Sequence, residues 1–314
     1  MDIKKKISEL KQIIYQKLFP LIDNDYVLYE VPFYNNVGDL LIWEGENQFL
    51  KSVKYKMVDC CSIYTYKENK NLSSDIIILL QGGGNFGDLW RMHQEFRLKI
   101  IQKYPNNKII IFPQTVYYQN HDIMLRDAKI MKQHKNLTIC ARDMVSYNLL
   151  KKYFSNNILL VPDMAFYIPT EQLLSKISHC QTNKTLYLKR NDKEFKNRIK
   201  LDFENHPIDI YDWPCMTHND IIQILLKILL RLKLYKLSLW YAQYIYKKFL
   251  INNSIKFVSK YKEIYTTRLH TSILCTLLEK QHHILDNSYG KNKNFYDTWF
   301  KDLEDVEFIE TKSN

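Results

Sequence analysis

Two arginines lie just after stretches of the sequence that are expected to form β-strands. Arg142 directly follows residues 137–141, and Arg268 follows residues 263–266 after one threonine. The guanidinium group is planar and permanently charged, so it suits phosphate or carboxylate. One such arginine is more often part of a structural ion pair. The second, however, is followed by Leu269 and His270, and a histidine in this place can act as a general acid or base. The pattern predicts chemistry on an anionic substrate.

Four of the seven glycines of the chain fall between residues 82 and 87. They follow residues 76–80, a continuous apolar run typical of a strand buried on both faces of a parallel sheet. We expect Gly83, Gly84 and Asn85 to form a tight turn that leads into a helix from Asp88. Such a turn exposes backbone amides to an anion or a polar ligand. The alternative is a tight turn that binds nothing.

Strands and helices alternate along the chain, which predicts an α/β protein with parallel sheets covered on both faces. The first half is expected to contain strands at residues 26–31, 57–60, 76–80, 108–114, 137–141 and 158–161, and the second half at residues 185–188, 208–210, 256–258, 263–266 and 283–285. The irregular, proline-bracketed residues 161–169 mark a domain crossing. We therefore expect domains at 1–162 and 163–290, with residues 291–314 packing back on the first.

Ligands of parallel α/β sheets bind at the carboxyl ends of the strands. Polar groups follow four of the expected strands, at residues 36–39, 82–85, 142–143 and 268–270. Metal-binding patterns are missing: the sequence has no HExxH, no DxD and no Cys/His cluster. It also has no Walker A lysine, no full dinucleotide-binding fingerprint and no nucleic-acid-binding signature. The sequence therefore favours an anion site built from side chains and predicts no metal site.

The compartment is inferred from the cysteines and from hydropathy. The six cysteines form no CxxC pair and no framework spacing, which indicates reduced thiols. The N-terminal stretch lacks the apolar core of a signal peptide, and no apolar run is long enough to span a membrane. We expect a cytoplasmic protein.

These motifs together resemble one family. They are Asn36-Val37-Gly38-Asp39, the glycine stretch from Gly82 to Asp88, Phe112-Pro113-Gln114, Ala141-Arg142-Asp143 with Ser146, Pro162-Asp163, Thr267-Arg268-Leu269-His270, and residues 286–291. Their order is similar to that of the polysaccharide pyruvyl transferase family, over about residues 30–300. The resemblance implies a GT-B-like fold, with two Rossmann-like domains facing a cleft. It also implies transfer of the enolpyruvyl group of phosphoenolpyruvate to a sugar, giving a pyruvate ketal.

The resemblance also implies roles for individual residues. Two arginines, Arg142 and Arg268, are expected to be catalytic and to bind the donor. The donor is also expected to contact Leu269, His270 and Lys291. His270 is the expected general acid or base. The acceptor sugar is assigned to the N-terminal domain, to Asn36, Asp39, Gly83, Gly84 and Asn85. Phosphoenolpyruvate is then a co-substrate, and no cofactor is expected.

Two other functions stay open at this point. A GT-B glycosyltransferase would use the same arginines on the diphosphate of a nucleotide sugar. A scaffold of polysaccharide assembly could have kept the fold and lost activity, although an intact pair of Arg268 and His270 argues mildly against this.

Residues 221–262 carry much of the charge and depart from the family pattern. They contain nine basic residues and no acidic one, so they supply +9 of the net charge of +11 and leave +2 for the rest of the chain. Residues 221–250 combine these cations with many apolar side chains, but one continuous helix would not separate the two kinds cleanly. The segment is either a half-buried helical pair whose lysines reach solvent or an interfacial element. The second reading places a peripheral protein, acting on a lipid-linked acceptor, at the inner face of the plasma membrane.

Overall fold

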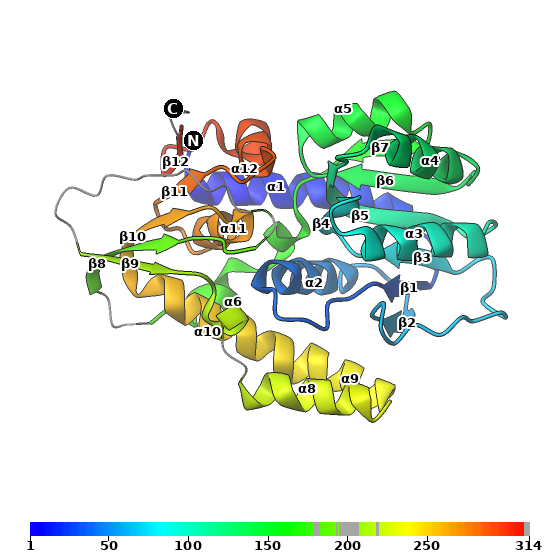
Figure 1. The fold of residues 1–314 in the computed structure, drawn as a ribbon, viewed down its shortest axis with the longest axis horizontal. Coiled ribbons are helices and arrows are strands. Elements are labelled where there is room, and N and C mark those ends of the chain that lie inside the picture. Colours follow the sequence, from blue (N-terminus) through cyan, green and yellow to red (C-terminus); the bar gives the residue numbers. More distant parts are fainter. Residues whose placement is uncertain (179–181, 193, 195–206, 218–219, 311–314) are drawn as a thin grey trace. The chain divides into compact units, whose positions relative to one another are not determined.

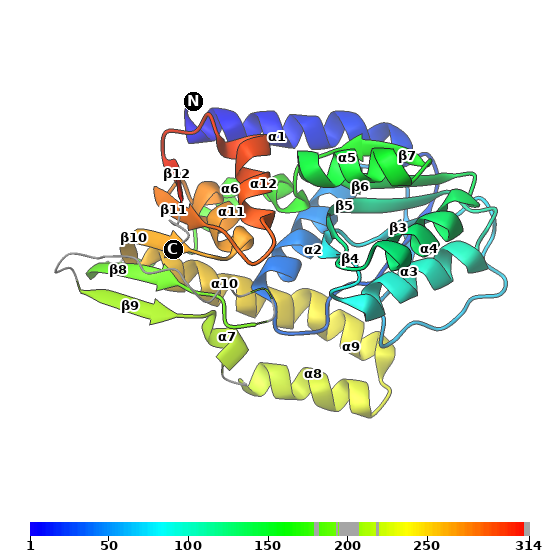
Figure 2. The same cartoon turned by 45° about the horizontal axis from the view of Figure 1, so that its top comes forward.

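The computed structural model describes residues 1–178, 182–192, 194, 207–217 and 220–310. In this part of the chain the strands form two sheets, and every strand pair is parallel. Helices connect many of the strands (Figures 1 and 2). The predicted α/β class with parallel sheets is confirmed.

The first sheet has seven strands in the order β2-β1-β3-β5-β6-β7, with β4 paired to β5 as well. These strands are β1 (Tyr26–Tyr29), β2 (Met57–Cys61), β3 (Ile77–Leu80), β4 (Gly83–Gly87), β5 (Ile109–Tyr117), β6 (Leu137–Ala141) and β7 (Asn157–Leu160). The helices of this half are α1 (Ile3–Leu18), α2 (Val37–Leu50), α3 (Arg91–Lys103), α4 (His121–Lys132) and α5 (Met144–Tyr153), with short turns η1 (Phe19–Leu21) and η2 (Met164–Tyr167).

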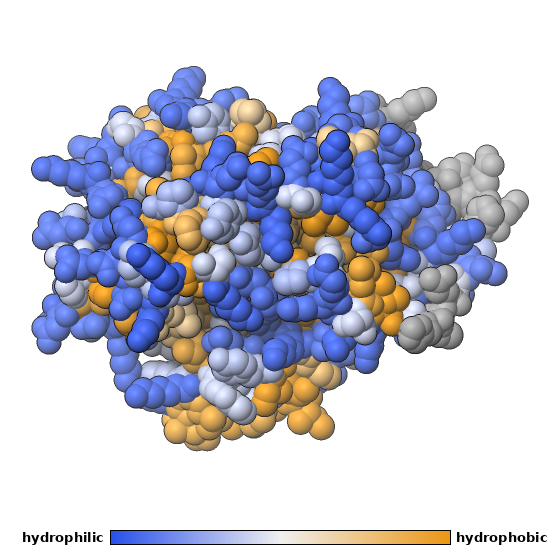
Figure 3. All heavy atoms as spheres, turned by 180° about the vertical axis from the view of Figure 1, so that it is seen from behind, coloured by the Kyte–Doolittle hydropathy of each residue, from blue (hydrophilic) through white to orange (hydrophobic). Residues whose placement is uncertain are grey.

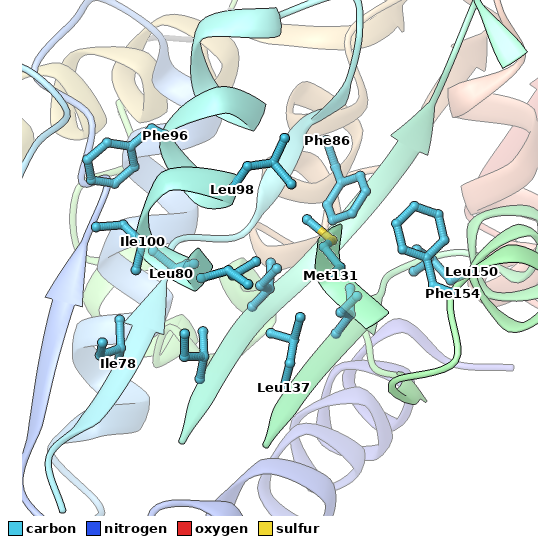
Figure 4. Close-up of a cluster of buried hydrophobic side chains, with 14 of the residues drawn as sticks. Ile78, Leu80, Phe86, Phe96, Leu98, Ile100, Met131, Leu137, Leu150 and Phe154 are labelled. Carbon is cyan, nitrogen blue, oxygen red and sulfur yellow. The ribbon is translucent and has the colours of Figure 1, made fainter. Parts of the chain in front are cut away.

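The core of the seven-stranded sheet lies on both of its faces. On one face, strand side chains pack with α3, α4 and α5 (Figure 4). Ile109 and Ile111 of β5 belong to this cluster. Phe112 points to the opposite face, since side chains alternate along a strand, and its ring meets Phe49 of α2 at 6.3 Å between centroids. The continuous apolar strands follow from this two-sided burial.

The second sheet has five strands in the order β12-β11-β10-β8-β9. They are β8 (Thr182–Leu188), β9 (Ile208–Tyr211), β10 (Tyr261–Thr266), β11 (His282–Leu285) and β12 (Val306–Ile309). The helices are α6 (Thr170–Leu174), α7 (Pro214–Thr217), α8 (Ile221–Arg231), α9 (Tyr235–Tyr241), α10 (Lys247–Ser259), α11 (Leu269–Leu277) and α12 (Lys291–Phe295), with π-helical turns η3 (Ala242–Tyr246) and η4 (Tyr296–Phe300).

The chain divides into two compact units. The seven-stranded unit comprises residues 11–33 and 42–167, and the five-stranded unit comprises residues 1–10, 34–41 and 168–314. The units therefore differ from the expected domains, because two short N-terminal segments cluster with the C-terminal half. Residues 291–310 also differ from their expected place on the first domain, since β12 extends the second sheet by pairing with β11.

The glycine stretch forms a strand, which corrects the predicted turn into a helix. β4 pairs with β5 through Gly83↔Gln114 and Gly87↔Tyr117, and α3 begins only at Arg91. Gly87 has a φ of 131°, and a Cβ there would lie 1.7 Å from the carbonyl oxygen of Tyr117. The glycines therefore allow close backbone pairing, and their amides are not at a helix N-terminus.

Residues 256–258, predicted as a strand, lie in α10. The buried residues Ile251, Ile255 and Val258 are spaced by four and three, which is the period of a helix and not of a strand. β5 also runs through Pro113, where a shift of register in its pairing with β6 between Ile111 and Gln114 accommodates the proline. No helix in the described ranges is long and apolar enough to cross a membrane.

Candidate functional site

His270 packs against Gly38 within the five-stranded unit. Arg268 is the N-cap of α11, so the partly buried His270 lies in the first turn of that helix. A Cβ built on Gly38 would lie 2.2 Å from Nδ1 of His270 and 2.7 Å from its Cγ. Only glycine leaves room for the ring, and two motifs far apart in the sequence meet at this contact.

Asn36 caps the helix that carries Gly38. Its Oδ1 accepts a hydrogen bond from the backbone N–H of Gly38 (3.0 Å), and its Nδ2 donates to the carboxylate of Asp39 (2.8 Å). Asn35 is held from the other side, since its Oδ1 accepts from the hydroxyl of Tyr246 (2.7 Å). The N-termini of α2 and α11 thus adjoin, and both carry the partial positive charge of a helix start.

This position corrects one expectation. Asn36 and Asp39 were assigned to the N-terminal domain together with Gly83, Gly84 and Asn85. In the structure, residues 34–41 cluster with His270 in the five-stranded unit, whereas β4 belongs to the seven-stranded unit. The physical reason is that α2 starts in one unit and continues in the other, which strand order in the sequence does not reveal.

Arg268 is buried in an ionic cluster. Its Nε and Nη2 donate to the two carboxylate oxygens of Asp212 at 2.5 and 2.6 Å, and Nη2 lies 3.5 Å from Asp192. Arg190 holds Asp192 with two bonds of 2.7 and 2.9 Å. Burial alone would raise the pKa of Asp192, but the hydrogen bonds and charge of Arg190, with a contribution from Arg268, hold that pKa below its usual value. Arg268 is therefore rigidly positioned.

Lys291 continues the cluster. Its Nζ donates to the carboxylate of Glu194 at 2.5 Å, and Nη1 of Arg190 donates to the same carboxylate at 2.7 Å. Asn287 and the hydroxyl of Tyr289 also donate to Glu194, each at 3.1 Å. The cluster thus contains three cations and three carboxylates, and the expected donor residues Arg268 and Lys291 lie in one network with Arg190.

Arg142 is fully buried in the seven-stranded unit. Its Nε donates to the hydroxyl of Thr115 (2.9 Å), and its Nη1 donates to the carboxylate of Asp163 (2.5 Å). The neighbouring Asp143 caps α5 by accepting from the N–H of Ser146 (2.8 Å). Burial raises the pKa of Asp143, although its hydrogen bonds with Ser146 and Thr115 favour the charged form. In this arrangement Arg142 joins the end of β6 to the segment before η2, and it presents no surface to solvent.

Asn85 belongs to a second buried network. Both its backbone carbonyl (3.1 Å) and its Oδ1 accept from the guanidinium of Arg97. Arg97 also donates twice to the carboxylate of Glu30, at 2.8 and 2.9 Å, and Nδ1 of His93 lies 2.9 Å from the same carboxylate. Outside this network, the backbone N–H of Gly82 donates a hydrogen bond to Oε1 of Glu46 (2.9 Å).

Glu30, His93 and Arg97 were missed by the sequence interpretation. Glu30 directly follows β1 and has a φ of 75°, a backbone region that is unfavourable for residues with a side chain. Two signals could have found the group. His93 and Arg97 are four residues apart on one helix face, and Glu30 is a single charge that ends an apolar strand.

The five-stranded unit brings together groups of the kind that contact anions in proteins. It combines fixed guanidinium and ammonium groups, two helix N-termini and an imidazole. The described ranges contain no group of three or more His, Cys, Asp or Glu residues that could hold a metal ion.

Comparison with known proteins decides the family. The family model described as "Polysaccharide pyruvyl transferase" matches residues 36–289, which is most of the chain. The chain belongs to the polysaccharide pyruvyl transferase family. "Putative pyruvyl transferase EpsO" of Bacillus subtilis is 35% identical over 100% of this chain and 97% of its own length. "Pyruvyl transferase 1" of Schizosaccharomyces pombe is 31% identical over 37% of this chain and 31% of its own length.

A solved structure supports the fold of this polysaccharide pyruvyl transferase family member. The uncharacterized protein KP1_0663 of Klebsiella pneumoniae matches 96% of the chain and 98% of its own, with a TM-score of 0.62 and 22% identity. The family match covers the contact between Gly38 and His270 as well as Arg268. Lys291 lies just beyond its end. The family resemblance predicted from the ordered motifs is confirmed.

Proposed function

We propose that the protein transfers the enolpyruvyl group of phosphoenolpyruvate to a sugar of a surface polysaccharide, or of its lipid-linked precursor, to form a pyruvate ketal. Family membership supports pyruvyl transfer. The contact of His270 with Gly38, in the unit that also holds the Arg268 cluster, is the observation that supports this donor, because phosphoenolpyruvate needs both anion binding and proton transfer.

The donor would be bound through its two anionic groups. Phosphoenolpyruvate carries a phosphate and a carboxylate on one carbon, so it requires at least two cationic contacts. Arg268 and Lys291 are the proposed pair. Nε and Nη2 of Arg268 are committed to Asp212, while Nη1 makes no hydrogen bond to any residue in the described ranges and is the proposed donor contact. The start of α11 would add favourable electrostatics.

The reaction would proceed by protonation of the donor. His270, as an imidazolium, gives a proton to the methylene carbon of phosphoenolpyruvate, which leaves positive charge on the central carbon. A sugar hydroxyl attacks that carbon and loses its proton to the neutral imidazole. Inorganic phosphate then departs with its bonding electrons, and a second hydroxyl attacks the same carbon to close the ketal ring, giving its proton to the released phosphate. The cationic residues offset the charge of the phosphate as its bond breaks.

Acceptor binding is assigned in two places. Asn36 and Asp39 adjoin His270 and are proposed to hold the attacking hydroxyl. Gly83, Gly84 and Asn85 lie in β4, and their contact with the acceptor stays a prediction from the family resemblance. The GT-B-like arrangement of the two units also stays a prediction from the family resemblance. Arg142 is proposed to act through Asp163 and Thr115 as a positioning residue, because its guanidinium is fully buried.

The donor is tested by binding and by product. The purified chain is titrated with phosphoenolpyruvate, inorganic phosphate and UDP-sugars in a thermal-shift assay. It is then incubated with phosphoenolpyruvate and oligosaccharides that carry neighbouring free hydroxyls. We expect stabilisation by phosphoenolpyruvate, phosphate release, and a product heavier than the acceptor by one pyruvic acid minus one water.

The alternatives give different results. Stabilisation by a UDP-sugar alone, with sugar transfer, would identify a glycosyltransferase. Binding of neither donor would favour a scaffold protein. Either outcome contradicts the proposal.

A further inference from the structure

The segment from Ile221 to Ile245 contains a helical hairpin, α8 and α9, in the five-stranded unit. The turn between the helices is formed by Leu232–Leu234, where Lys233 has a φ of 58° and the N–H of Leu234 bonds to the carbonyl of Leu229 (3.0 Å). The hydroxyl of Tyr241 donates to the carbonyl of Ile222 (3.0 Å), so the helices lie side by side. The break explains why one continuous helix over 221–250 gives no clean pattern.

Helix α8 has a buried inner face and an exposed apolar outer face. Gln223, Leu226 and Leu229 form the inner face and are buried. The outer face consists of apolar residues at the spacing of one helix face, i, i+3, i+4, i+7 and i+11. These residues are Ile221, Ile224, Leu225, Ile228 and Leu232, exposed by 40% to 82%. Packing within the unit therefore explains the inner face of α8 but not the apolar residues of its outer face.

The second helix continues the exposed face. Leu234, Leu237, Trp240, Tyr244 and Ile245 are large hydrophobic residues that are each exposed by more than a third. Figure 3 shows the resulting apolar surface at the lower edge of the molecule, over α8 and α9. We call these ten residues, five from each of the two sets, the hairpin patch. Contiguous exposed apolar surface of this kind marks a docking site.

The charge around the hairpin patch identifies its partner. The exposed cations are Lys227, Arg231, Lys233, Lys236 and Lys248, and no acidic residue occurs from Ile221 to Lys262. In α8, Lys227 and Arg231 lie beside the outer face, one residue before Ile228 and Leu232. An apolar stripe bordered by cations, with Trp and Tyr in it, matches an anionic lipid surface: apolar side chains enter the acyl boundary, aromatic rings lie at headgroup level, and cations meet phosphates.

A second copy of the chain fits this face poorly. Self-association would bring two sets of five cations together, and like charges at an interface oppose binding. We propose that the hairpin patch docks the protein on an anionic bilayer surface, as a peripheral contact made by two interfacial helices. This inference stands independently of the proposed donor and acceptor.

Vesicle cosedimentation of the full chain tests it. We expect binding to phosphatidylglycerol-containing vesicles at low salt, weaker binding as salt is raised, and little binding to pure phosphatidylcholine. Replacing Lys227, Arg231, Lys233 and Lys236 with Gln should weaken binding, by up to about five-fold for each cation removed. A matched control changes Lys256, Lys260 and Lys262 to Gln. These exposed cations flank the same segment but lie outside the hairpin, and we expect their loss to have a smaller effect per charge.

Two further variants separate docking from nonspecific charge attraction. Ile224→Gln with Ile228→Gln keeps the charge and should also reduce binding, while circular dichroism confirms the helices. Trp240→Phe should keep binding and remove the vesicle-induced blue shift of tryptophan fluorescence. The inference is overturned if neutral vesicles bind equally well. It is also overturned if the Ile224/Ile228 variant binds like wild type, or if ultracentrifugation shows a dimer that this variant dissociates.

Discussion

The place of His270 depends on a neighbour that has no side chain. The ring occupies the space that a Cβ on Gly38 would take, and Asn36 fixes the backbone beneath it through the N–H of Gly38. An Asn-x-Gly-Asp motif at the start of one helix therefore determines where the imidazole at the start of another can lie. Gly38 is a positioning residue in the proposed reaction, and His270 is the catalytic one.

Gly38→Ala should displace the imidazole and lower transfer by about 100-fold, since a shift of about 1 Å at a reacting group has this scale of effect. Alanine is well tolerated in a helix, so the fold should persist. The measurement is kcat for phosphate release from phosphoenolpyruvate.

The control is a double-mutant cycle with His270→Ala. Once the ring is removed, Ala at position 38 has room, and Gly38→Ala should cost little more in that background. Multiplicative losses in the double variant would mean that Gly38 acts by a route other than His270.

Arg268 is fixed by a carboxylate and is also the proposed contact for the donor. Its fork is held by Asp212, which orders the group before any ligand arrives. Arg268→Ala should weaken phosphoenolpyruvate binding by roughly 1.5–3 kcal/mol, the value of a charge-assisted hydrogen bond. Arg268→Lys should recover only part of it, because an ammonium cannot reproduce the planar fork. Calorimetric titration with phosphoenolpyruvate measures both.

Lys293→Ala provides the matched control for charge. Lys293 is in the same unit and pairs with Asp297 on the surface, so its loss removes one positive charge without touching the cluster. If donor affinity falls equally in Arg268→Ala and Lys293→Ala, then Arg268 contributes only its positive charge and makes no specific contact with the donor.

At the scale of elements, periodicity predicted most of the fold. The strands around Ile78 and Ile111 contain continuous apolar runs and were recognised for that reason. The glycine stretch was misread because glycines after a strand usually signal a turn, whereas here they permit β4 to pair closely with β5. Residues 256–258 were misread because three residues are too few to distinguish the period of a strand from that of a helix.

Helix α11 and strand β11 are joined by a buried histidine whose protonation should affect stability. Nδ1 of His282 donates to the carbonyl of Lys280 (2.9 Å), and its Nε2 accepts from the hydroxyl of Ser272 (2.6 Å). The bond from Ser272 requires the neutral ring, because a protonated Nε2 cannot accept, whereas Nδ1 can donate to Lys280 in either state. Burial lowers the pKa of His282 from 6.5 to about 4. Between pH 4 and pH 6.5 the unfolded chain binds more protons at His282 than the folded chain does. The free energy of unfolding should therefore rise with pH and fall on acidification.

The contribution of His282 should be about 2 kcal/mol less at pH 5 than at pH 7. Denaturant unfolding at the two pH values measures it. His282→Asn should flatten the difference, whereas His283→Asn, a change at the neighbouring ring, should leave most of it. An unchanged pH dependence in His282→Asn would assign the effect to other groups.

At the scale of the whole molecule, the sequence indicated two α/β halves but not their composition. One boundary between the two units falls after residue 167, within the proline-bracketed residues 161–169. The sequence did not predict that residues 1–10 and 34–41 belong to the five-stranded unit, because this depends on contacts between segments distant in the sequence. The contact of Gly38 with His270 is one of these, and the bonds of Lys6 and the N-terminus to Asp302 are others. Local propensity carries no information about such pairs.

The first turns of α1 should therefore stabilise the five-stranded unit, although they lie at the opposite end of the chain. Ile7 is buried and belongs to that unit. Ile7→Ala should cost about 2–4 kcal/mol through the cavity it leaves, while Ser8→Ala, an exposed change on the same helix, should be nearly neutral. Hydrogen exchange resolves where the cost appears: amides of β10 and β11 should exchange faster, and those of β5 and β6 should keep their protection. Loss of protection confined to β5 and β6 would place Ile7 in the seven-stranded unit and contradict the division.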